Sequence, residues 1–233
     1  MVQSVAPVSS KTLTFEEYLV YEGEPDVLYE LFRGHLIPMP APRSKHARIC
    51  LFLVYQLQRY FALKNLPFVA VTTVGVRTEE ASSRIPDVVV CSQSLWEQIC
   101  DRPSSSVLDF EETPRLVIEV TSDNWRDDYI RKRAEYDFRD IPEYWIVDAN
   151  KSRIRICSYP ENENTYEHKD LLPGEQMQCV QFADLVLPVD LVLSPPIVED
   201  LIRAEEAKRQ QLEERAQRLA QKLQEMGIDP NSV

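Results

Sequence analysis

Two short apolar segments, rich in β-branched residues, have the pattern of strands that are buried on both faces. They are Ile85–Cys91 (IPDVVVC) and Leu116–Ser122 (LVIEVTS). Each segment contains an acid, Asp87 in the first and Glu119 in the second. A carboxylate in the core of a sheet is strongly disfavoured unless a cation meets it. We therefore interpret the two acids as parts of one site.

Two longer segments repeat apolar residues every three or four positions, which is the spacing of an amphipathic helix. The first follows Ser44, and the second follows the polar residues 122–124 and ends before Pro142. Further strands are predicted at 27–39, 68–77, 143–148, 153–159 and 165–172. The first of these is a hairpin that turns at Arg33-Gly34. The order of elements predicts an α/β fold with a mixed central β-sheet flanked by helices.

The two ends of the chain differ in pattern from the middle. We predict a flexible leader at 1–11, one domain at 12–196 and a charged C-terminal helix within 197–233. The helix has few apolar positions, and they follow a 4-3-4-3 spacing: Leu212, Ala216, Leu219, Leu223 and Met226. Such a helix can dock on the body as a solvated terminal element, or it can form a short coiled coil that makes a homodimer.

Composition limits the classes of protein that fit. The chain has 233 residues, of which 44% are hydrophobic and 27% charged, enough for one core and an appendage. Its five cysteines have no Cys-x-x-Cys spacing, so neither a zinc site nor a disulfide framework is indicated. No signal peptide and no apolar run of about 18 residues is present, which predicts a cytoplasmic protein without a membrane partner. The net charge of −12 argues against a general polyanion binder, so any nucleic-acid contact must be local.

Other side chains could join the two strand acids, but each also has a simpler structural explanation. Glu30 lies on the first arm of the hairpin, where it is a third candidate acid or an edge-strand residue that points inward. His46 lies in the first turn of a helix, where it is a site residue or a surface and capping residue. Asp87 could simply begin a strand. Glu119 could pair with an arginine, for which Arg84 and Arg115 are the candidates.

The strand acids resemble the core of the PD-(D/E)XK nucleases, with Pro86-Asp87 followed by Glu119-Val120-Thr121. Thr121 stands where that pattern has its lysine. A wider set of segments resembles the Uma-type restriction-endonuclease-like family of bacteria, over residues 12–193. The segments are YELFRGHLIPMP with a later His, RIPDVVV, LVIEVTS, DDYIRKRAEY and IPEYWIVD. In that family the lysine lies on the following helix, in a D-x-x-x-K-x-x-x-Y pattern that here falls on Asp128, Lys132 and Tyr136.

The resemblance implies a magnesium-dependent endonuclease that hydrolyses phosphodiester bonds of DNA, with Mn²⁺ as a substitute ion. Asp87, Glu119 and the backbone carbonyl of Val120 would hold the ion, because hard oxygen ligands suit Mg²⁺. Lys132 would stabilise the developing charge or orient the attacking water. Glu30 would be the fourth catalytic residue and would complete the metal shell or orient Lys132. Three residues would support them: Tyr136 would bind a phosphate oxygen, and Asp128 and His46 would accompany the site. The alternative is a catalytically silent nuclease-like module that acts in binding or assembly through its C-terminal helix.

Helical geometry adds one expectation about Lys132. At 100° per residue, Asp128, Lys132 and Tyr136 lie within about 80° of one another, and Ile130 and Phe138 lie on the opposite, apolar stripe with Ala134. If that stripe packs on the sheet, the polar face looks away from Glu119 unless the site lies at the edge of the strand. In that case Lys132 is an ordinary i, i+4 partner of Asp128, and its removal scarcely changes stability.

Overall fold

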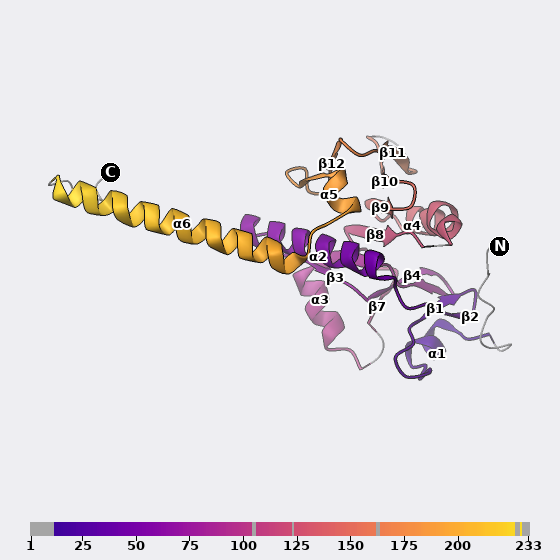
Figure 1. Ribbon diagram of the computed structural model, residues 1–233. Helices are drawn as coiled ribbons and strands as arrows, with labels where there is room; N and C mark the ends of the chain where they lie inside the picture. Colours follow the sequence, from indigo (N-terminus) through magenta and orange to yellow (C-terminus); the bar gives the residue numbers. More distant parts are fainter. Residues whose placement is uncertain (1–11, 104–105, 123, 162–163, 227–228, 230–233) are drawn as a thin grey trace. The chain divides into compact units, whose positions relative to one another are not determined.

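The computed structural model describes residues 12–103, 106–122, 124–161, 164–226 and 229 (Figure 1). The predicted leader at 1–11 lies outside the described residues. The chain divides after Pro195 into two compact units, a body and a C-terminal segment. The predicted α/β class with mixed sheets flanked by helices is confirmed.

A six-stranded mixed sheet forms the centre of the body, in the order β11-β10-β9-β8-β6-β3. Its strands are β3 (Phe68–Val71), β6 (Val88–Ser92), β8 (Leu116–Val120), β9 (Glu143–Asp148), β10 (Arg153–Ser158) and β11 (Glu167–Leu171). β8 pairs parallel with β9 and antiparallel with β6, with Val88 opposite Ile118. The two segments that carry the strand acids are therefore neighbours, and Asp87 comes to the end of β8 that bears Glu119.

A second, five-stranded sheet has the order β2-β1-β5-β4-β7. Its strands are β1 (Tyr29–Phe32), β2 (His35–Pro38), β4 (Gly75–Glu79), β5 (Ser82–Arg84) and β7 (Val107–Leu108). β1 and β2 form the predicted hairpin, and its turn places both Arg33 and Gly34 at positive φ, 49° and 81°. β1 also pairs with β5, which brings Glu30 beside Arg84. A small two-stranded sheet joins β12 (Gln176–Gln178) to β13 (Val186–Pro188).

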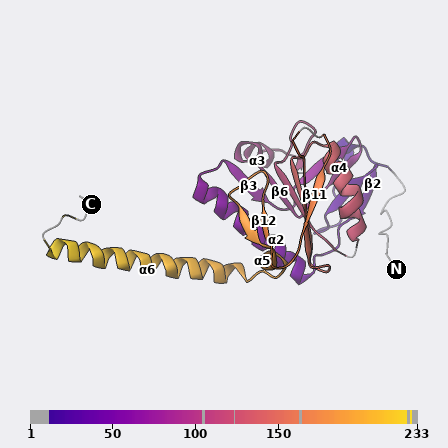
Figure 2. The same cartoon turned by 90° about the horizontal axis from the view of Figure 1, so that it is seen from above.

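Helices cover the central sheet, and Figure 2 shows its strands between α2 and α4. The helices of the body are α1 (Phe15–Leu19), α2 (Ser44–Lys64), α3 (Gln93–Cys100), the π-helix Asp127–Lys132, α4 (Arg133–Phe138) and α5 (Val189–Leu193). The apolar stripe of α2 is buried, and this helix contacts β3, β6 and β8. Tyr129 and Tyr136 pack in a core with Val117, which shares its face of β8 with Glu119 because strand side chains alternate. The π-helix and α4 therefore cover the face of the sheet from which Glu119 projects.

The C-terminal unit contains one long helix, α6 (Val198–Glu225), with no buried residue. Its charged side chains pair along the helix, for example Arg209 with Glu206 and Arg218 with Glu214. Leu212 and Leu219 of the predicted apolar seam are exposed, as is Met226 just beyond the helix. Among the described residues, no helix is both long enough and apolar enough to cross a membrane.

Candidate functional site

Lys132 lies among three buried carboxylates that come from three separate elements. Its Nζ lies 2.9 Å from Glu119 Oε1 at the end of β8, and 3.4 Å from Glu30 Oε1 of β1. Asp128 Oδ1, one turn earlier on the same helix, is 3.7 Å away. Lys132 is only 7% exposed and Glu119 only 4%. The i, i+4 pair with Asp128 therefore exists, but it is the longest of the three contacts, and the strand acid is the nearest partner.

The orientation of this helix is opposite to the one that the apolar stripe predicts. Ile130 and Phe138 are 61% and 87% exposed, whereas Asp128, Lys132 and Tyr136 are buried against the sheet. Exposing an apolar side chain costs about 1.5–3 kcal/mol, but burying Glu119 and Glu30 without a cation would cost more. In addition, Asp127–Lys132 is π-helical, so the even 100° step does not hold there. The apolar stripe therefore does not pack on the sheet, and the condition under which the polar face would look away from Glu119 is not met.

Tyr136 completes the surroundings of Glu119. Its hydroxyl donates a 2.9 Å hydrogen bond to Glu119 Oε1, the same oxygen that Lys132 contacts. Tyr136 has no exposed surface, and burial raises the pKa of its phenol well above the usual value, so the hydroxyl keeps its proton. Both of these hydrogen bonds end on Oε1. Among the described residues, Oε2 of Glu119 is therefore the oxygen that remains for another ligand.

The charges of the cluster shift one another's pKa values. Burial is the largest cause and raises the pKa of Glu119; Lys132 lowers it, the charges of Asp87, Asp128 and Glu30 raise it further, and the pKa of Glu119 stands well above its usual range. Burial, together with neighbouring acids, also raises the pKa of Asp128 to about 6, against the effect of Lys132. Burial lowers the pKa of Lys132, but the surrounding carboxylates outweigh it, and the pKa ends well above the ordinary value. Lys132 is charged throughout the neutral range.

Arg84 forms a second ionic centre beside the first. Its guanidinium lies 3.0 Å from Glu30 Oε2 and makes two hydrogen bonds, of 2.6 and 2.7 Å, to the carboxylate of Glu135. Asp127 Oδ2 is 3.5 Å away. Glu30 also accepts the backbone N–H of Ile85, at 3.1 Å. Burial raises the pKa of Glu30, but Lys132, Arg84 and this N–H outweigh it, and the pKa is lowered. Arg84 thus pairs with Glu30 and Glu135, and the partner of Glu119 is Lys132, so the alternative in which Arg84 pairs with Glu119 does not apply.

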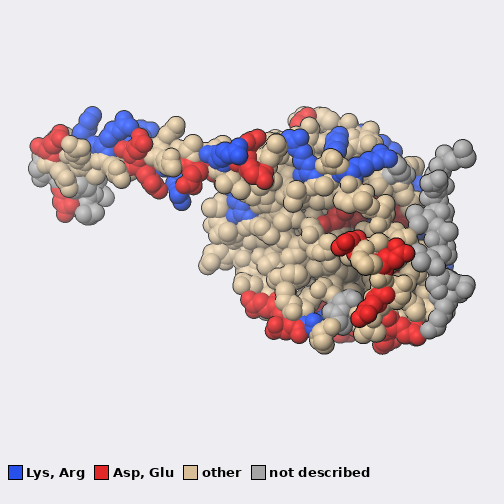
Figure 3. Space-filling model, turned by 60° about the horizontal axis from the view of Figure 1, so that its bottom comes forward, with Lys and Arg blue, Asp and Glu red and all other residues tan. Residues whose placement is uncertain are grey.

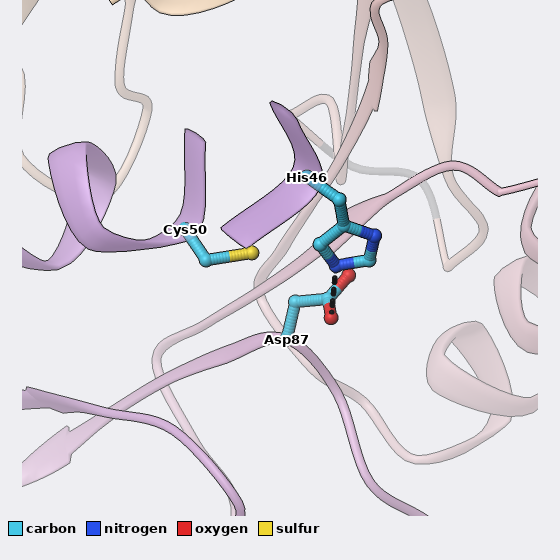
Figure 4. Close-up of side chains that lie close together, drawn as sticks. All are labelled: His46, Cys50 and Asp87. Carbon is cyan, nitrogen blue, oxygen red and sulfur yellow. Dashed lines mark hydrogen bonds and ion pairs between the residues drawn. The ribbon is translucent and has the colours of Figure 1, made fainter. Parts of the chain in front are cut away.

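Asp87 links the central sheet to α2. Its Oδ2 accepts the backbone N–H of Val120 at 2.7 Å, and its Oδ1 lies 2.7 Å from His46 Nε2 (Figure 4). His46 is in the first turn of α2, where no side chain caps the helix, so the capping explanation for His46 does not apply. The side chains of Asp87 and His46 remain 15% and 20% exposed. Solvent therefore reaches this pair.

Sequence reasoning missed Cys50 and Glu135. Cys50 follows His46 by one helical turn, and its sulfur lies within 4.8 Å of the ligand atoms of His46 and Asp87. Burial, with the charges of Asp87 and Glu119, raises the pKa of the Cys50 thiol. The His-x-x-x-Cys spacing was readable in the sequence, but its third partner lies 37 residues further along the chain. Glu135 gave no signal of its own, because an acid on a charged helix is ordinary.

The donor set fits a hard divalent cation. Six carboxylates, those of Glu30, Asp87, Glu119, Asp127, Asp128 and Glu135, surround two cations, Arg84 and Lys132. The excess of negative charge favours a bound cation, and oxygen donors favour Mg²⁺ or Mn²⁺. Thr121, two residues beyond Glu119, adds a buried hydroxyl without a hydrogen-bond partner among the described residues. Such an oxygen is available to a ligand or to its water shell.

Comparisons with known proteins place these features in context. The Uma2 family model, described as "Putative restriction endonuclease", matches residues 15–190. Among solved structures, the chain is similar to a crystal structure from Anabaena variabilis, described as "a putative nuclease belonging to DUF820". The identity is 20% and the TM-score 0.61, over 78% of this chain and 98% of the other, a likeness that concerns the fold. A search of the curated proteins found no match.

Proposed function

Because this chain belongs to the Uma2 family, we propose that it is a divalent-metal-dependent endonuclease that hydrolyses phosphodiester bonds of DNA. One observation carries the proposal: the Lys132 ammonium lies 2.9 Å from Glu119, at the end of the sheet where Asp87 meets β8. Two acids and a lysine are the side chains that such a reaction needs, and here the lysine comes from a helix while Thr121 occupies the expected position. We assign the nuclease domain to 12–196 and the tail to 197–233.

Asp87, Glu119 and the backbone carbonyl of Val120 would hold the ion, with Mg²⁺ as the proposed metal and Mn²⁺ as a substitute. When bound, such an ion lowers the pKa of a coordinated water and neutralises the scissile phosphate. The hydrogen bond from Val120 N–H fixes the rotamer of Asp87, and the bonds from Lys132 and Tyr136 fix that of Glu119. The two acids are thus held in position before any ligand arrives.

Lys132 would stabilise negative charge that develops on the phosphate, or orient the attacking water. A charged ammonium suits this role, and its raised pKa keeps it protonated. Glu30 acts through Lys132: its Oε1 faces the ammonium, while Arg84 and the N–H of Ile85 hold the carboxylate in place. Since these contacts use both oxygens of Glu30, the role of a positioning residue is favoured over that of a metal ligand. Asp128 would help to position Lys132, because its Oδ1 lies 3.7 Å from the ammonium.

The substrate would meet the protein over a limited area. The chain carries a net charge of −12. On the face of the body drawn in Figure 3, acidic side chains lie along the lower margin and at mid-height on the right, and basic ones gather mainly along the upper margin. That face has no continuous basic surface of the kind that tracks a phosphate backbone. We therefore expect weak, salt-sensitive binding of DNA, with cleavage that depends on added divalent metal.

A nuclease assay tests the proposal. Purified protein is incubated with supercoiled, linear and single-stranded DNA in Mg²⁺, in Mn²⁺ and in chelator. We expect metal-dependent nicking or cutting, lost in Asp87→Asn and Glu119→Gln and retained in Asp184→Asn, an exposed acid paired with Lys64. Circular dichroism verifies the fold of each variant. Cleavage that survives both site substitutions would exclude this site.

A second candidate is a catalytically silent module that acts in binding or assembly. The exposed apolar residues of α6, Leu212 and Leu219, favour it, because they offer a helical surface to a partner. Under this alternative, DNA stays intact in every metal tested, and deletion of the tail abolishes the association of the protein with itself or with a partner.

A further inference from the structure

Three side chains of different chemistry meet at the solvent-accessible edge of the site (Figure 4). The ligand atoms of His46, Cys50 and Asp87 all lie within 4.8 Å of one another. His46 and Cys50 are one turn apart on α2, so they project from the same face of the helix. In Figure 4 the Cys50 sulfur points toward the imidazole and carboxylate pair. Asp87 lies immediately before β6 and faces these two side chains.

The three donors together select for an ion other than Mg²⁺. Imidazole nitrogen, thiolate sulfur and carboxylate oxygen are all ligands of Zn²⁺, at about 2.0–2.3 Å, whereas Mg²⁺ takes oxygen almost alone. In a tetrahedral site with such bonds the ligand atoms stand about 3.4 Å apart. The 2.7 Å separation of His46 Nε2 and Asp87 Oδ1 would have to open by less than about 1 Å. The Cys50 sulfur, which lies within 4.8 Å of both atoms, would have to approach them by about 1.4 Å at most.

The surroundings suit an exchangeable ion. The N–H of Val120 holds Oδ2 of Asp87, which leaves Oδ1 facing His46 and the ion position. His46 and Asp87 are partly exposed and Cys50 is 9% exposed, so an ion can enter from solvent while most of its shell is protein. Three protein ligands leave a fourth position for water.

We propose that His46, Cys50 and Asp87 form a binding site for Zn²⁺, and that Zn²⁺ there displaces the Mg²⁺ or Mn²⁺ ion held by Asp87 and Glu119. On binding, the S–H bond of Cys50 breaks, its proton passes to the buffer, and a metal–sulfur bond forms. The first part of the proposal stands on the three ligands alone. The second part rests on the proposed function, because Asp87 would be shared by both ions. Zinc would therefore act as an inhibitor of the nuclease.

Cobalt is the probe for the first part, because a thiolate bound to Co²⁺ gives a near-ultraviolet charge-transfer band. Full-length protein is titrated with Co²⁺ and then with Zn²⁺. We expect the band in the wild type, its loss on adding Zn²⁺, and its loss in Cys50→Ala. The matched control is Cys91→Ala, which removes another buried cysteine and should keep the band. Removing a group that only orients a ligand already costs about 10–100-fold in affinity, so loss of a ligand in Cys50→Ala or His46→Ala should weaken zinc binding by at least about tenfold.

Binding of Mn²⁺, followed by electron paramagnetic resonance without DNA, tests the second part. We expect Zn²⁺ to release Mn²⁺ from the wild type, and at least about tenfold more Zn²⁺ to be needed in Cys50→Ala. Absence of the cobalt band in the wild type, or a band that persists in Cys50→Ala, would overturn the zinc site even if the protein binds Mn²⁺ and cuts DNA. A cobalt band without Mn²⁺ binding or cleavage would instead refute the proposed function and leave the zinc site standing. Mn²⁺ that stays bound at saturating Zn²⁺ would overturn the competition.

Discussion

Replacing Lys132 with methionine tests whether this lysine is a buried cation or an exposed one. Methionine has nearly the length of lysine but no charge, so the substitution removes the partner of Glu119, Glu30 and Asp128 without leaving a large cavity. Breaking a buried ion pair by removing one partner costs about 3–5 kcal/mol, because the other charge stays buried. Each residue of this cluster is less than one-tenth exposed. We therefore expect a loss of about 3–5 kcal/mol in the free energy of unfolding at about pH 8.

The loss should depend on pH. Asp128 and Glu119 already have raised pKa values, about 6 for Asp128, and removal of Lys132 takes away the charge that lowers both. An acid whose pKa is raised by folding destabilises the folded state once it ionises, so stability falls as pH rises through the folded pKa. Acidification to about pH 5 protonates these acids and should recover a large part of the loss.

Urea unfolding of metal-free protein at the two pH values measures both effects. The control is Arg131→Met, a substitution on the same helix at an exposed arginine, 3.5 Å from Asp127. It should cost about 0.5 kcal/mol or less, as exposed ion pairs do. If Lys132→Met costs as little as Arg131→Met at about pH 8, Lys132 is a surface partner of Asp128 and the buried cluster does not exist in solution.

Three further predictions follow from the same contacts. Asp128→Asn should raise the free energy of unfolding of metal-free protein at neutral pH and leave it unchanged at about pH 4. The pKa of about 6 means that ionisation of Asp128 opposes folding. A lower free energy of unfolding at neutral pH would contradict this. Arg84→Met should destabilise the body by about 3–5 kcal/mol, since the guanidinium serves both Glu30 and Glu135; thermal unfolding against Arg131→Met checks it. Deleting residues from Ile197 onward should leave the unfolding midpoint of the body unchanged, because α6 buries no side chain. If the seam of α6 dimerises the protein, sedimentation should show that the deletion converts a dimer to a monomer. A dimer that persists after the deletion would place the interface on the body.

Local pattern was sufficient for the main strands of the central sheet and for the strand acids. β-branched runs around Asp87 and Glu119 predicted the two buried strands, and they are β6 and β8. Arg33-Gly34 forms the turn of the first hairpin, as predicted. In each case the determining interaction lies within a few residues of sequence, so the pattern carries the information.

Helix orientation was the first thing that local pattern could not determine. By periodicity alone, the helix after β8 should bury Ile130 and Phe138 and expose Lys132, yet the reverse is found. The reason is the charge of residues far away in sequence. Glu30 and Glu119 come from strands of two different sheets, and the pairing of those strands brings both acids to the helix. Burying these carboxylates without a cation would cost more free energy than exposing two apolar side chains does.

The sequence by itself determined the fold class, the family resemblance and the acids Asp87 and Glu119, because these depend on composition and on short-range spacing. Only the tertiary structure decided which partner each charge has: Lys132 for Glu119, Arg84 for Glu30 and Glu135, and His46 for Asp87. It also brought Cys50 to the edge of the site, across 37 residues from Asp87. Partners are chosen by distance in space and by the low dielectric of the interior, and neither is encoded in the order of residues along the chain.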